Sequence, residues 1–366
     1  MALRRRSRMI RAGIIFGGRS AEHEVSVLSA SSLFGAIDRT KYDPVPIGID
    51  KEGRWFLIEA GLECIETLDD PRVKTLISGA RRALDPGDLP ALLDFAFPVL
   101  HGPYGEDGRI QGLFEMLDLP YGGCGVAASA VAMDKIFTRE LWARAGLPVC
   151  RHTVLRRHAY AADPVGERDR VARALGYPIF VKPANLGSSV GIGKASDADA
   201  LARGIEEAFL YDSRLILEEG LDCRDIEIGV LGNEETAVSA VGEIVPAAEF
   251  YDYDSKYRSD ATKLFVPADI PPETAAEIGA LAQRAYAALN AAGFARIDFF
   301  LERKTGAVLL NEINTIPGFT AHSMFPRLWR AAGVSYEGLI ERIIGLGYER
   351  YHAENNRKPN NAQRGR

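Results

Sequence analysis

The sequence predicts an α/β (α+β) protein of two or three domains, and two patterns support this prediction. In the first third of the chain, short apolar segments typical of buried strands alternate with segments of helical periodicity. Such alternation indicates a parallel sheet covered by helices. Near the C-terminus, two strand-like segments follow one another across a short turn, which is typical of an antiparallel hairpin. The length of 366 residues suits two or three domains of ordinary size.

The chain divides into five segments in this interpretation. Residues 1–8 and 351–366 are polar and offer little apolar surface to bury, so we expect a disordered leader and a disordered tail. Between them we expect a Rossmann-like domain with a parallel sheet at 9–134, a central unit at 135–225 and a C-terminal unit at 226–350.

The expected elements of each unit follow from apolar periodicity and from Gly and Pro breaks. In the first unit they are strands at 12–16 and 94–100 and helices at 25–37 and 126–145. In the central unit they are strands at 177–183, 190–195 and 214–218 and a helix at 197–209. In the last unit they are strands at 226–231, 296–301 and 307–313 and helices at 272–291 and 336–344.

Composition and charge argue against several classes of function. The net charge is −6, which gives no reason to expect nucleic acid as a partner. No apolar run approaches the roughly 18–20 residues of a membrane span. The cysteines at 64, 124, 150 and 223 form no CxxC or Cys/His metal spacing, so we expect reduced thiols and a cytoplasmic protein.

The C-terminal hairpin carries the strongest chemical signal. Arg296 and Asp298 lie two residues apart and therefore share one face of their strand. A turn centred near Thr305 would place Asp298 opposite Glu312 and Arg296 opposite Asn314. Hard oxygen ligands of this kind suit Mg²⁺ that bridges phosphates, with the arginine as a second source of positive charge.

An alternative explanation of the hairpin is an exposed polar face with a cross-strand ion pair. The neighbouring residues are strongly apolar, which favours a buried face. Facing carboxylates without a cation would also destabilise the hairpin. We therefore favour the metal site.

A Gly/Ser-rich turn at residues 182–191 (KPANLGSSVG) is the second signal. Its small residues let backbone N–H groups approach an anion, and Lys182 and the hydroxyls add further donors. No GxxxxGK[ST] motif occurs in the chain, so this is not a P-loop. Phosphate binding and a merely flexible hairpin both remain open from this pattern.

Three weaker patterns complete the set. Residues 123–128 (GCGVAA) match a relaxed dinucleotide fingerprint, but no acidic residue ends a strand about 20 residues later, which disfavours a dehydrogenase. Glu22 begins a helix after a strand, where it could simply complement the helix dipole. His101 follows a strand end, where ligands of open α/β sheets bind. Residues 251–257 (YDYDSKY) have no regular period and indicate a functional loop.

Taken together, these segments resemble the D-alanine–D-alanine ligase family over residues 10–347. Any one motif would be weak evidence, whereas seven in the family order are specific. They are residues 17–26 (GGRSAEHEVS), 101–108 (HGPYGEDG), 133–135 (MDK), 182–191, 251–257, 295–298 (ARID) and 311–320 (NEINTIPGFT).

The resemblance implies an ATP-grasp fold with ATP bound between the central and C-terminal units. It implies that Lys135, Lys182 and Ser189 bind phosphates, that Glu218 and Glu219 lie beside the adenine, that Asp225 binds the ribose and that Lys256 also contacts ATP. It implies that Asp298, Glu312 and Asn314 bind two Mg²⁺ or Mn²⁺ ions. One departure is that the usual Gly-Arg-Glu is Cys-Arg-Asp here, which makes Asp225 one methylene shorter.

The implied reaction joins two D-alanine molecules through D-alanyl phosphate, for peptidoglycan precursor synthesis. Glu22 would hold the first substrate, with His101 nearby, and Arg296 and the N–H of Gly318 would stabilise the oxyanion. The second substrate would bind at Lys256, Ser323 and Met324. Residues 251–257 would form a lid, fastened by a network of Tyr257, Ser188 and Glu22. The family also suggests a homodimer.

Two rival functions follow from the same residues. Within the class, the alternative is a D-alanine–D-lactate or D-alanine–D-serine ligase, and Tyr257 argues against a lactate-forming enzyme. Outside the class, the alternative is an ATP-binding regulatory protein that has lost turnover. Competent residues at every matched catalytic position argue against this second alternative.

Overall fold

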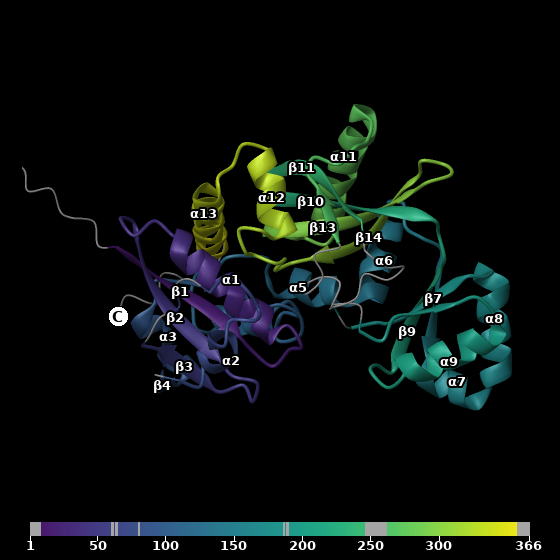
Figure 1. Ribbon diagram of the computed structural model, residues 1–366, viewed down its shortest axis with the longest axis horizontal. Coiled ribbons are helices and arrows are strands. Elements are labelled where there is room, and N and C mark those ends of the chain that lie inside the picture. The colour runs from purple at the N-terminus through teal and green to yellow at the C-terminus, as the bar shows by residue number, and fades with distance from the viewer. Residues whose placement is uncertain are drawn as a thin grey trace, which may run out of the picture.

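The computed structural model describes residues 9–59, 62, 65–79, 81–185, 187, 190–245 and 262–356. Three sheets organise this part of the chain, in the strand orders β4-β3-β2-β1-β5, β6-β9-β7-β8 and β12-β11-β10-β13-β14. The N-terminal sheet, the central sheet and the C-terminal sheet occupy three successive regions of the molecule (Figure 1). The calls that fall on residues 1–8 and 357–366 lie outside the described residues.

The N-terminal sheet is parallel in its core and antiparallel at one edge. Strand β1 pairs in parallel with both β2 and β5, as the alternating pattern predicted. Strands β3 and β4 add to β2 in antiparallel orientation, so the sheet is mixed rather than fully parallel. Its elements are β1 (Ile10–Gly17), α1 (His23–Ala36), β2 (Tyr42–Ile49), β3 (Trp55–Ile58), α2 (Arg72–Thr75), β4 (Arg81–Leu84), η1 (Pro86–Asp88), α3 (Leu89–Leu92), β5 (Phe95–Pro98) and α4 (Arg109–Met116).

The segment at 126–145 forms two helices instead of the single predicted helix. Helix α5 (Val126–Met133) ends before Asp134, and α6 (Lys135–Arg144) begins after it. The Asp134 carboxylate accepts hydrogen bonds from the backbone N–H groups of Ile136 and Phe137, which makes Asp134 the N-cap of α6. This new helix start places Lys135 in the first turn of α6.

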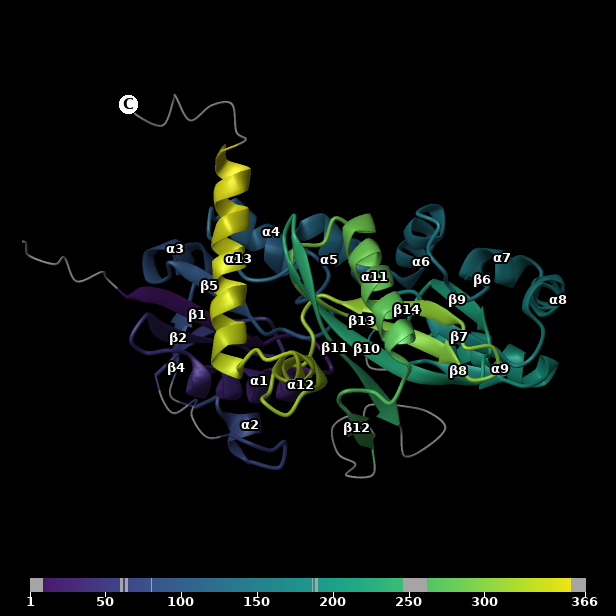
Figure 2. The same ribbon diagram turned by 90° about the horizontal axis from the view of Figure 1, so that it is seen from above.

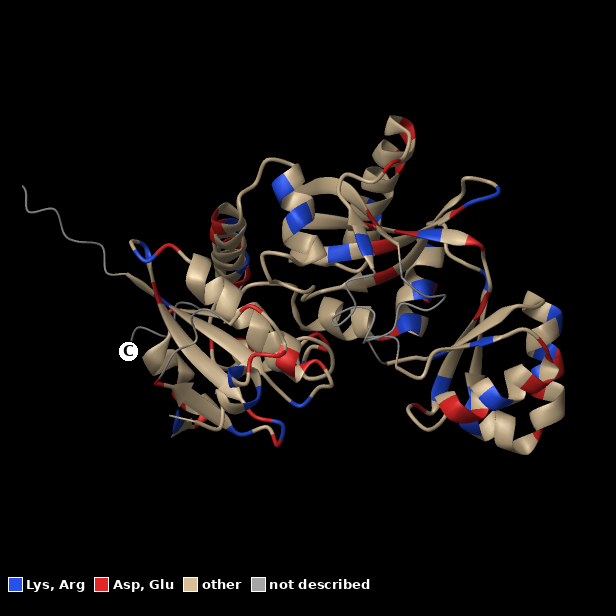
Figure 3. Ribbon diagram, in the orientation of Figure 1, with Lys and Arg blue, Asp and Glu red and all other residues tan. Residues whose placement is uncertain are grey.

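The central unit is a small antiparallel sheet with helices packed against it. Its hydrophobic core consists of its own residues, from Leu155 to Leu217. Its elements are β6 (His152–Arg156), α7 (Arg157–Ala162), α8 (Pro164–Leu175), β7 (Ile179–Pro183), β8 (Gly193–Ala195), α9 (Ala198–Ala208) and β9 (Arg214–Glu219). Acidic and basic residues are interspersed along its helices (Figure 3).

The C-terminal sheet contains the predicted hairpin in the predicted register. Arg296 faces Asn314 and Asp298 faces Glu312 across strands β13 and β14, which confirms the sequence-based pairing. The elements of this unit are β10 (Cys223–Gly232), β11 (Thr236–Val245), β12 (Lys263–Phe265), α11 (Pro272–Ala288), β13 (Gly293–Glu302), β14 (Val308–Asn314), α12 (Met324–Ala331) and α13 (Tyr336–Asn356).

Helix α13 is longer than the sequence predicted and runs beside the N-terminal domain (Figure 2). It includes residues 351–356, so the assignment of these residues to a disordered tail is wrong. Tertiary contacts hold the extension: the Tyr348 hydroxyl donates to the Asp94 carbonyl at 3.0 Å, and Arg350 Nη1 donates to the Tyr121 hydroxyl at 2.9 Å. One hydrophobic core includes residues of β1, β5, α12 and α13, which joins the two ends of the chain.

None of the helices in the described ranges is both long enough and apolar enough to cross a membrane. The division of the chain at residues 134 and 225 stays a prediction.

Candidate functional site

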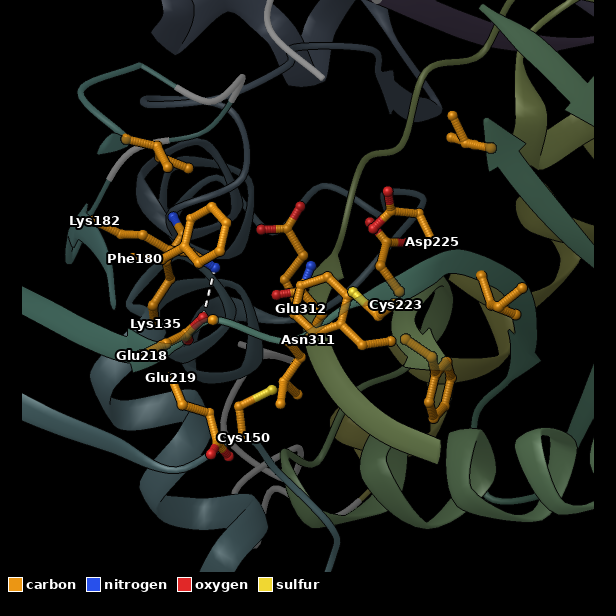
Figure 4. A pocket seen from close by; sticks show the side chains of 18 of the residues that line it. Lys135, Cys150, Phe180, Lys182, Glu218, Glu219, Cys223, Asp225, Asn311 and Glu312 are labelled. Atoms are coloured by element: carbon orange, nitrogen blue, oxygen red, sulfur yellow. Dashed lines mark hydrogen bonds and ion pairs between the residues drawn. The ribbon is translucent and has the colours of Figure 1, made fainter. Parts of the chain in front are cut away.

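A cleft of about 680 Å³ lies between the central and C-terminal sheets. Figure 4 shows lysines and glutamates on one wall and acidic residues, Asn311 and Cys223 on the other. Apolar side chains of both units line it as well, including Phe180 and Phe300. A cleft with apolar walls and a few convergent charges is the usual form of a small-molecule site.

A buried ion-pair cluster organises the central wall of the cleft. Lys182 Nζ on β7 donates to Glu218 Oε2 on β9 at 2.6 Å. Arg139 Nη2 on α6 donates to Glu218 Oε1 at 2.8 Å. Arg139 also donates to the Leu310 carbonyl and, at 3.1 Å, to Asn311 Oδ1 on β14, so it links the two walls. Glu218 therefore fixes a cationic lysine at the cleft surface.

Glu218 should make stability depend on acid pH. Burial alone raises the pKa of Glu218, but Arg139 and Lys182 outweigh it and hold this pKa at about 2. A depressed carboxyl pKa contributes stability above the unfolded pKa of about 4.5 that is lost as the pH falls toward about 2, on the order of 3 kcal/mol in total.

We expect Glu218→Gln to destabilise the protein most at neutral pH, because Arg139 and Lys182 then lose their anionic partner. Urea unfolding of both proteins at pH 7, 4 and 3 measures the effect. The difference in the free energy of unfolding should shrink below pH 4.5. A difference that stays constant over this range would contradict the assigned pKa.

The opposite wall carries the acidic hairpin and Arg296. Arg296 Nε donates to Asp298 Oδ1, and Nη2 donates to Asp298 Oδ2, both at 2.7 Å. Asn314 Nδ2 donates to Asp298 Oδ2 at 3.0 Å, and Glu227 Oε2 on β10 lies 3.0 Å from Arg296 Nε. Burial alone lowers the pKa of Arg296, but Asp298 and Glu227 outweigh it and raise this pKa well above its ordinary value.

The hairpin residues fit a divalent cation. Glu227, Asp298 and Glu312 all interact electrostatically with Arg296, so this group of four has an excess of two negative charges. Asp298, Glu312 and Asn314 supply oxygen ligands of the type that Mg²⁺ and Mn²⁺ prefer. Within the described ranges, no cluster of three or more His, Cys, Asp or Glu residues has the spacing of a metal site, so the amide of Asn314 is needed to complete the set.

Beyond the cleft, His101 joins the N-terminal domain to the loop after β14. Its Nδ1 lies 2.8 Å from the Ile316 carbonyl, which can only accept, so Nδ1 carries the proton. Its Nε2 lies 2.9 Å from the Ser29 hydroxyl, which then donates. Burial lowers the pKa of His101, in agreement with a neutral ring. Both ring nitrogens are thus used to hold the two segments together.

Glu106 makes a second connection between the same segments. Its Oε2 accepts from the Gly102 N–H and its Oε1 accepts from the Ile316 N–H, both at 2.8 Å. Burial, followed by the charge of Glu22, raises the pKa of Glu106 to about 8. Glu22 also lies next to the Gly/Ser turn, because a methyl group on Gly187 would lie 3.7 Å from its Oε2. The proposed first-substrate residue thus lies beside the end of the cleft that Gly187 lines.

Ser323 and Gly318 lie together in the loop that precedes α12. Ser323 is the N-cap residue of α12, and its hydroxyl lies 2.8 Å from the Thr320 hydroxyl. A methyl group on Gly318 would lie 3.2 Å from Ser323 Oγ. Met324 follows in the first turn and packs against Ile244 and Leu328. The start of α12 presents backbone N–H groups, which suit a carboxylate.

The structure brings most of the predicted site residues to this cleft and its rim. Those that line the cleft are Lys135, Lys182, Glu218, Glu219, Asp225, Arg296, Asp298 and Glu312. Four others lie outside the described residues, namely Ser188, Ser189, Lys256 and Tyr257. Cys150 and Cys223 also line the cleft, but burial raises their thiol pKa values to about 11 and about 12, so neither is a thiolate at neutral pH.

Sequence reasoning missed three residues that organise the site: Arg139, Glu106 and Glu227. Glu106 lies within the motif at 101–108, and Glu227 lies two residues after Asp225 on the same strand face. Arg139 follows Lys135 by one helical turn. Each carried a local signal, but the partners are 79 to 210 residues away for Arg139 and Glu106.

Comparison with known proteins agrees with this geometry. Residues 11–124 match the family model described as D-ala D-ala ligase N-terminus, and residues 141–345 match D-ala D-ala ligase C-terminus. A D-alanine–D-alanine ligase from Geobacillus thermodenitrificans is 45% identical over 354 residues, which cover 93% of this chain and 96% of that protein. One from Acetivibrio thermocellus is 42% identical over 361 residues, with the same coverage.

Two solved structures are similar throughout. The VanG D-Ala:D-Ser ligase from Enterococcus faecalis has a TM-score of 0.83 and 34% identity, and the match covers 93% of this chain and all of that one. The D-alanine–D-alanine ligase from Coxiella burnetii has a TM-score of 0.81 and 32% identity, with 95% and 97% coverage.

The fold and the cleft between two antiparallel sheets are those of an ATP-grasp ligase. With family matches that span both ends of the sequence, the chain belongs to the D-alanine–D-alanine ligase family.

Proposed function

We propose that this protein joins two D-alanine molecules to D-alanyl-D-alanine with ATP, for peptidoglycan precursor synthesis, and that the cleft between the central and C-terminal sheets is its active site. The observation that supports this most strongly is the cleft itself, with Lys182 on one wall and the Asp298–Glu312 pair on the other. A first test is ADP release by the purified protein, which should require both Mg²⁺ and D-alanine. ADP release at the same rate without D-alanine would contradict the proposal.

ATP is proposed to lie along the cleft. Its phosphates would contact Lys135 and Lys182, with Ser189 as a further donor, and its adenosine would contact Glu219, Asp225 and Lys256. Phe180 and Phe300 supply apolar surface for the adenine. Glu218, which the sequence placed beside the adenine, has both carboxylate oxygens bound to Lys182 and Arg139. We therefore assign to it the holding of Lys182 as well.

Asp298, Glu312 and Asn314 are the residues proposed to hold two Mg²⁺ or Mn²⁺ ions. When bound, such ions offset the negative charge of the transferring phosphoryl group. The support for this assignment is the negative excess around Arg296 and the facing carboxylates of the hairpin.

The proposed chemistry has two steps. A carboxylate oxygen of the first D-alanine attacks the γ-phosphorus of ATP, the bond to the β-phosphate oxygen breaks, and ADP leaves. The neutral amine of the second D-alanine then attacks the carbonyl carbon of D-alanyl phosphate, and inorganic phosphate leaves. Arg296 and the Gly318 N–H would stabilise the oxyanion between these events.

The two substrates are proposed to bind at opposite sides of the reacting carbon. Glu22 would hold the ammonium of the first D-alanine, near His101. Because both nitrogens of His101 are used in protein contacts, we assign it to positioning the loop after β14. Ser323 at the start of α12, with Lys256, would hold the carboxylate of the second D-alanine beside Met324.

A lid formed by residues 251–257 is proposed to exclude water, fastened by Tyr257, Ser188 and Glu22. Tyr257→Phe and Ser188→Ala should each raise the ratio of ADP to dipeptide, because water then reaches D-alanyl phosphate. The double variant should be little worse than either single variant, because the groups act as one unit. Both products can be quantified in one reaction. Additive effects, or an unchanged ratio, would mean that the lid is held in another way.

One rival substrate has support from the comparisons. The structural similarity to the VanG ligase, whose title specifies D-Ala:D-Ser, favours D-serine as the alternative second substrate over D-lactate. A homodimer and a cytoplasmic location are proposed from the family resemblance.

A further inference from the structure

Arg296 is held by carboxylates from two different strands. Asp298, on its own strand β13, accepts two hydrogen bonds from the guanidinium at 2.7 Å. Glu227, on the neighbouring strand β10, faces Asp298 in the antiparallel register and places Oε2 3.0 Å from Arg296 Nε. The Glu227 side chain is 6% exposed, and that of Arg296 is 15% exposed. The pair is thus largely removed from water, where ion pairs are strongest and most costly to break.

This arrangement conflicts with the metal site unless Arg296 changes partner. Both oxygens of Asp298 accept hydrogen bonds, from Arg296 and, at Oδ2, also from Asn314. A cation that binds Asp298 must displace at least one of these donors, because the metal and the guanidinium compete for the same lone pairs. A buried guanidinium that loses its carboxylate without a replacement costs several kcal/mol. That penalty would weaken metal binding.

We propose that Glu227 is the second anchor of Arg296, which keeps the guanidinium in the cleft when Asp298 turns to the metal. Glu227 is a positioning residue, because it acts through Arg296 and not on substrate. The proposal rests on the proposed function, since it assumes that Asp298 is a metal ligand. It accounts for a buried carboxylate beside the metal ligands that neither the substrates nor ATP require.

The register explains why Glu227 suits this role. Glu227 lies opposite Asp298, while Arg296 lies opposite Gly229, so the arginine lies diagonally between the two carboxylates. A small rotation of the guanidinium therefore transfers Nε from one carboxylate to the other. Its Nη groups are then available for the γ-phosphate and the oxyanion, which is the fork geometry that arginine provides.

The experiment compares full-length wild-type protein with Glu227→Gln and Glu227→Asp. The readout is the Mg²⁺ concentration that produces half of the maximal rise in the thermal unfolding midpoint, in the presence of a non-hydrolysable ATP analogue. This readout needs no turnover. Glu243→Gln is the matched control, because Glu243 is also a buried glutamate of this sheet and forms a two-bond pair with Arg224 at 2.7 Å.

We expect Glu227→Gln to raise the half-saturating Mg²⁺ concentration about tenfold, the scale of one lost charge partner, and Glu243→Gln to change it less than twofold. Glu227→Asp should not restore the wild-type value, because its carboxylate is one methylene too short for contact. In an Arg296→Ala background, Glu227→Gln should cause no further loss. Wild-type Mg²⁺ dependence in Glu227→Gln, rescue by Asp, or an equal loss without Arg296 would each overturn the proposal.

Two provisions keep the outcomes separate. If Glu227→Gln does not fold, Glu227→Asp alone decides, since a wild-type Mg²⁺ requirement in that variant overturns the proposal. Dipeptide formation by the wild-type protein is measured in parallel. Its absence would contradict the proposed function, whereas an active wild-type enzyme with an unaffected Glu227→Gln variant would contradict only the role of Glu227.

Discussion

Glu312→Gln is expected to abolish dipeptide formation while the protein stays folded. The change removes one negative charge from the metal site and leaves the side chain almost the same size, and hard divalent cations prefer a carboxylate to an amide. Glu312 faces Asp298 across the hairpin and lines the cleft, so no other described residue occupies its place in the register. We expect a loss of roughly 1,000-fold in kcat, the scale that follows removal of one charge-stabilising group.

The measurement is steady-state dipeptide formation over a range of Mg²⁺ concentrations, with circular dichroism as the check on folding. Glu302→Gln is the matched control, because Glu302 lies at the far end of the same hairpin, next to the turn. The control should retain nearly full activity. Activity of Glu312→Gln within a few-fold of wild type, with the same Mg²⁺ dependence, would remove Glu312 from the metal site.

Arg296→Lys should be the second most damaging change, although it keeps the positive charge. Arg296 spans the two oxygens of Asp298 and also contacts Glu227, which a single ammonium group cannot reproduce. A lysine also cannot present two parallel donors to a phosphate and an oxyanion. We expect kcat to fall by roughly 100-fold or more, with a smaller change in the KM for ATP.

Single-turnover measurements would show which step is affected. If Arg296 stabilises both the phosphoryl transfer and the oxyanion, ADP formation and dipeptide formation should both slow. Arg303→Lys is a suitable control, because Arg303 is half exposed and its ion pair with Asp222 is a surface pair, which contributes little. Nearly full activity of Arg296→Lys would make Arg296 a structural residue and assign the oxyanion to other donors.

The hairpin shows which parts of the site can be predicted from sequence. A two-residue period and a short turn determine which side chains share a face and which face one another. These local rules predicted that Asp298 faces Glu312 and that Arg296 faces Asn314, and the structure confirms both pairs. No long-range information was needed, because the two strands are adjacent in the chain.

Glu227 and Arg139 show why the rest of the site could not be predicted in this way. Glu227 meets Asp298 only because β10 pairs with β13, across about 70 residues of intervening chain, and the local pattern of neither strand specifies that pairing. Arg139 has the sequence environment of an ordinary helical arginine. Its burial between Glu218 and Asn311 follows from the packing of α6 between two sheets.

The C-terminal helix illustrates the same limit for the fold. Residues after Ile344 lack a strong apolar stripe, so the pattern predicted an early end to the helix. The structure continues α13 to Asn356, with Arg350 buried against Tyr121 and Tyr348 against strand β5. A polar helix can therefore be stabilised by hydrogen bonds to another domain, which hydrophobic periodicity does not record.

Product identification by mass spectrometry tests the central claim most directly. The purified protein is incubated with ATP and Mg²⁺ and with equal concentrations of D-alanine, D-serine and D-lactate, so that the second substrates compete in one reaction. The account predicts D-alanyl-D-alanine as the main product, with one ADP formed for each dipeptide. Predominant D-alanyl-D-serine or D-alanyl-D-lactate, or ADP without any condensed product, would contradict it.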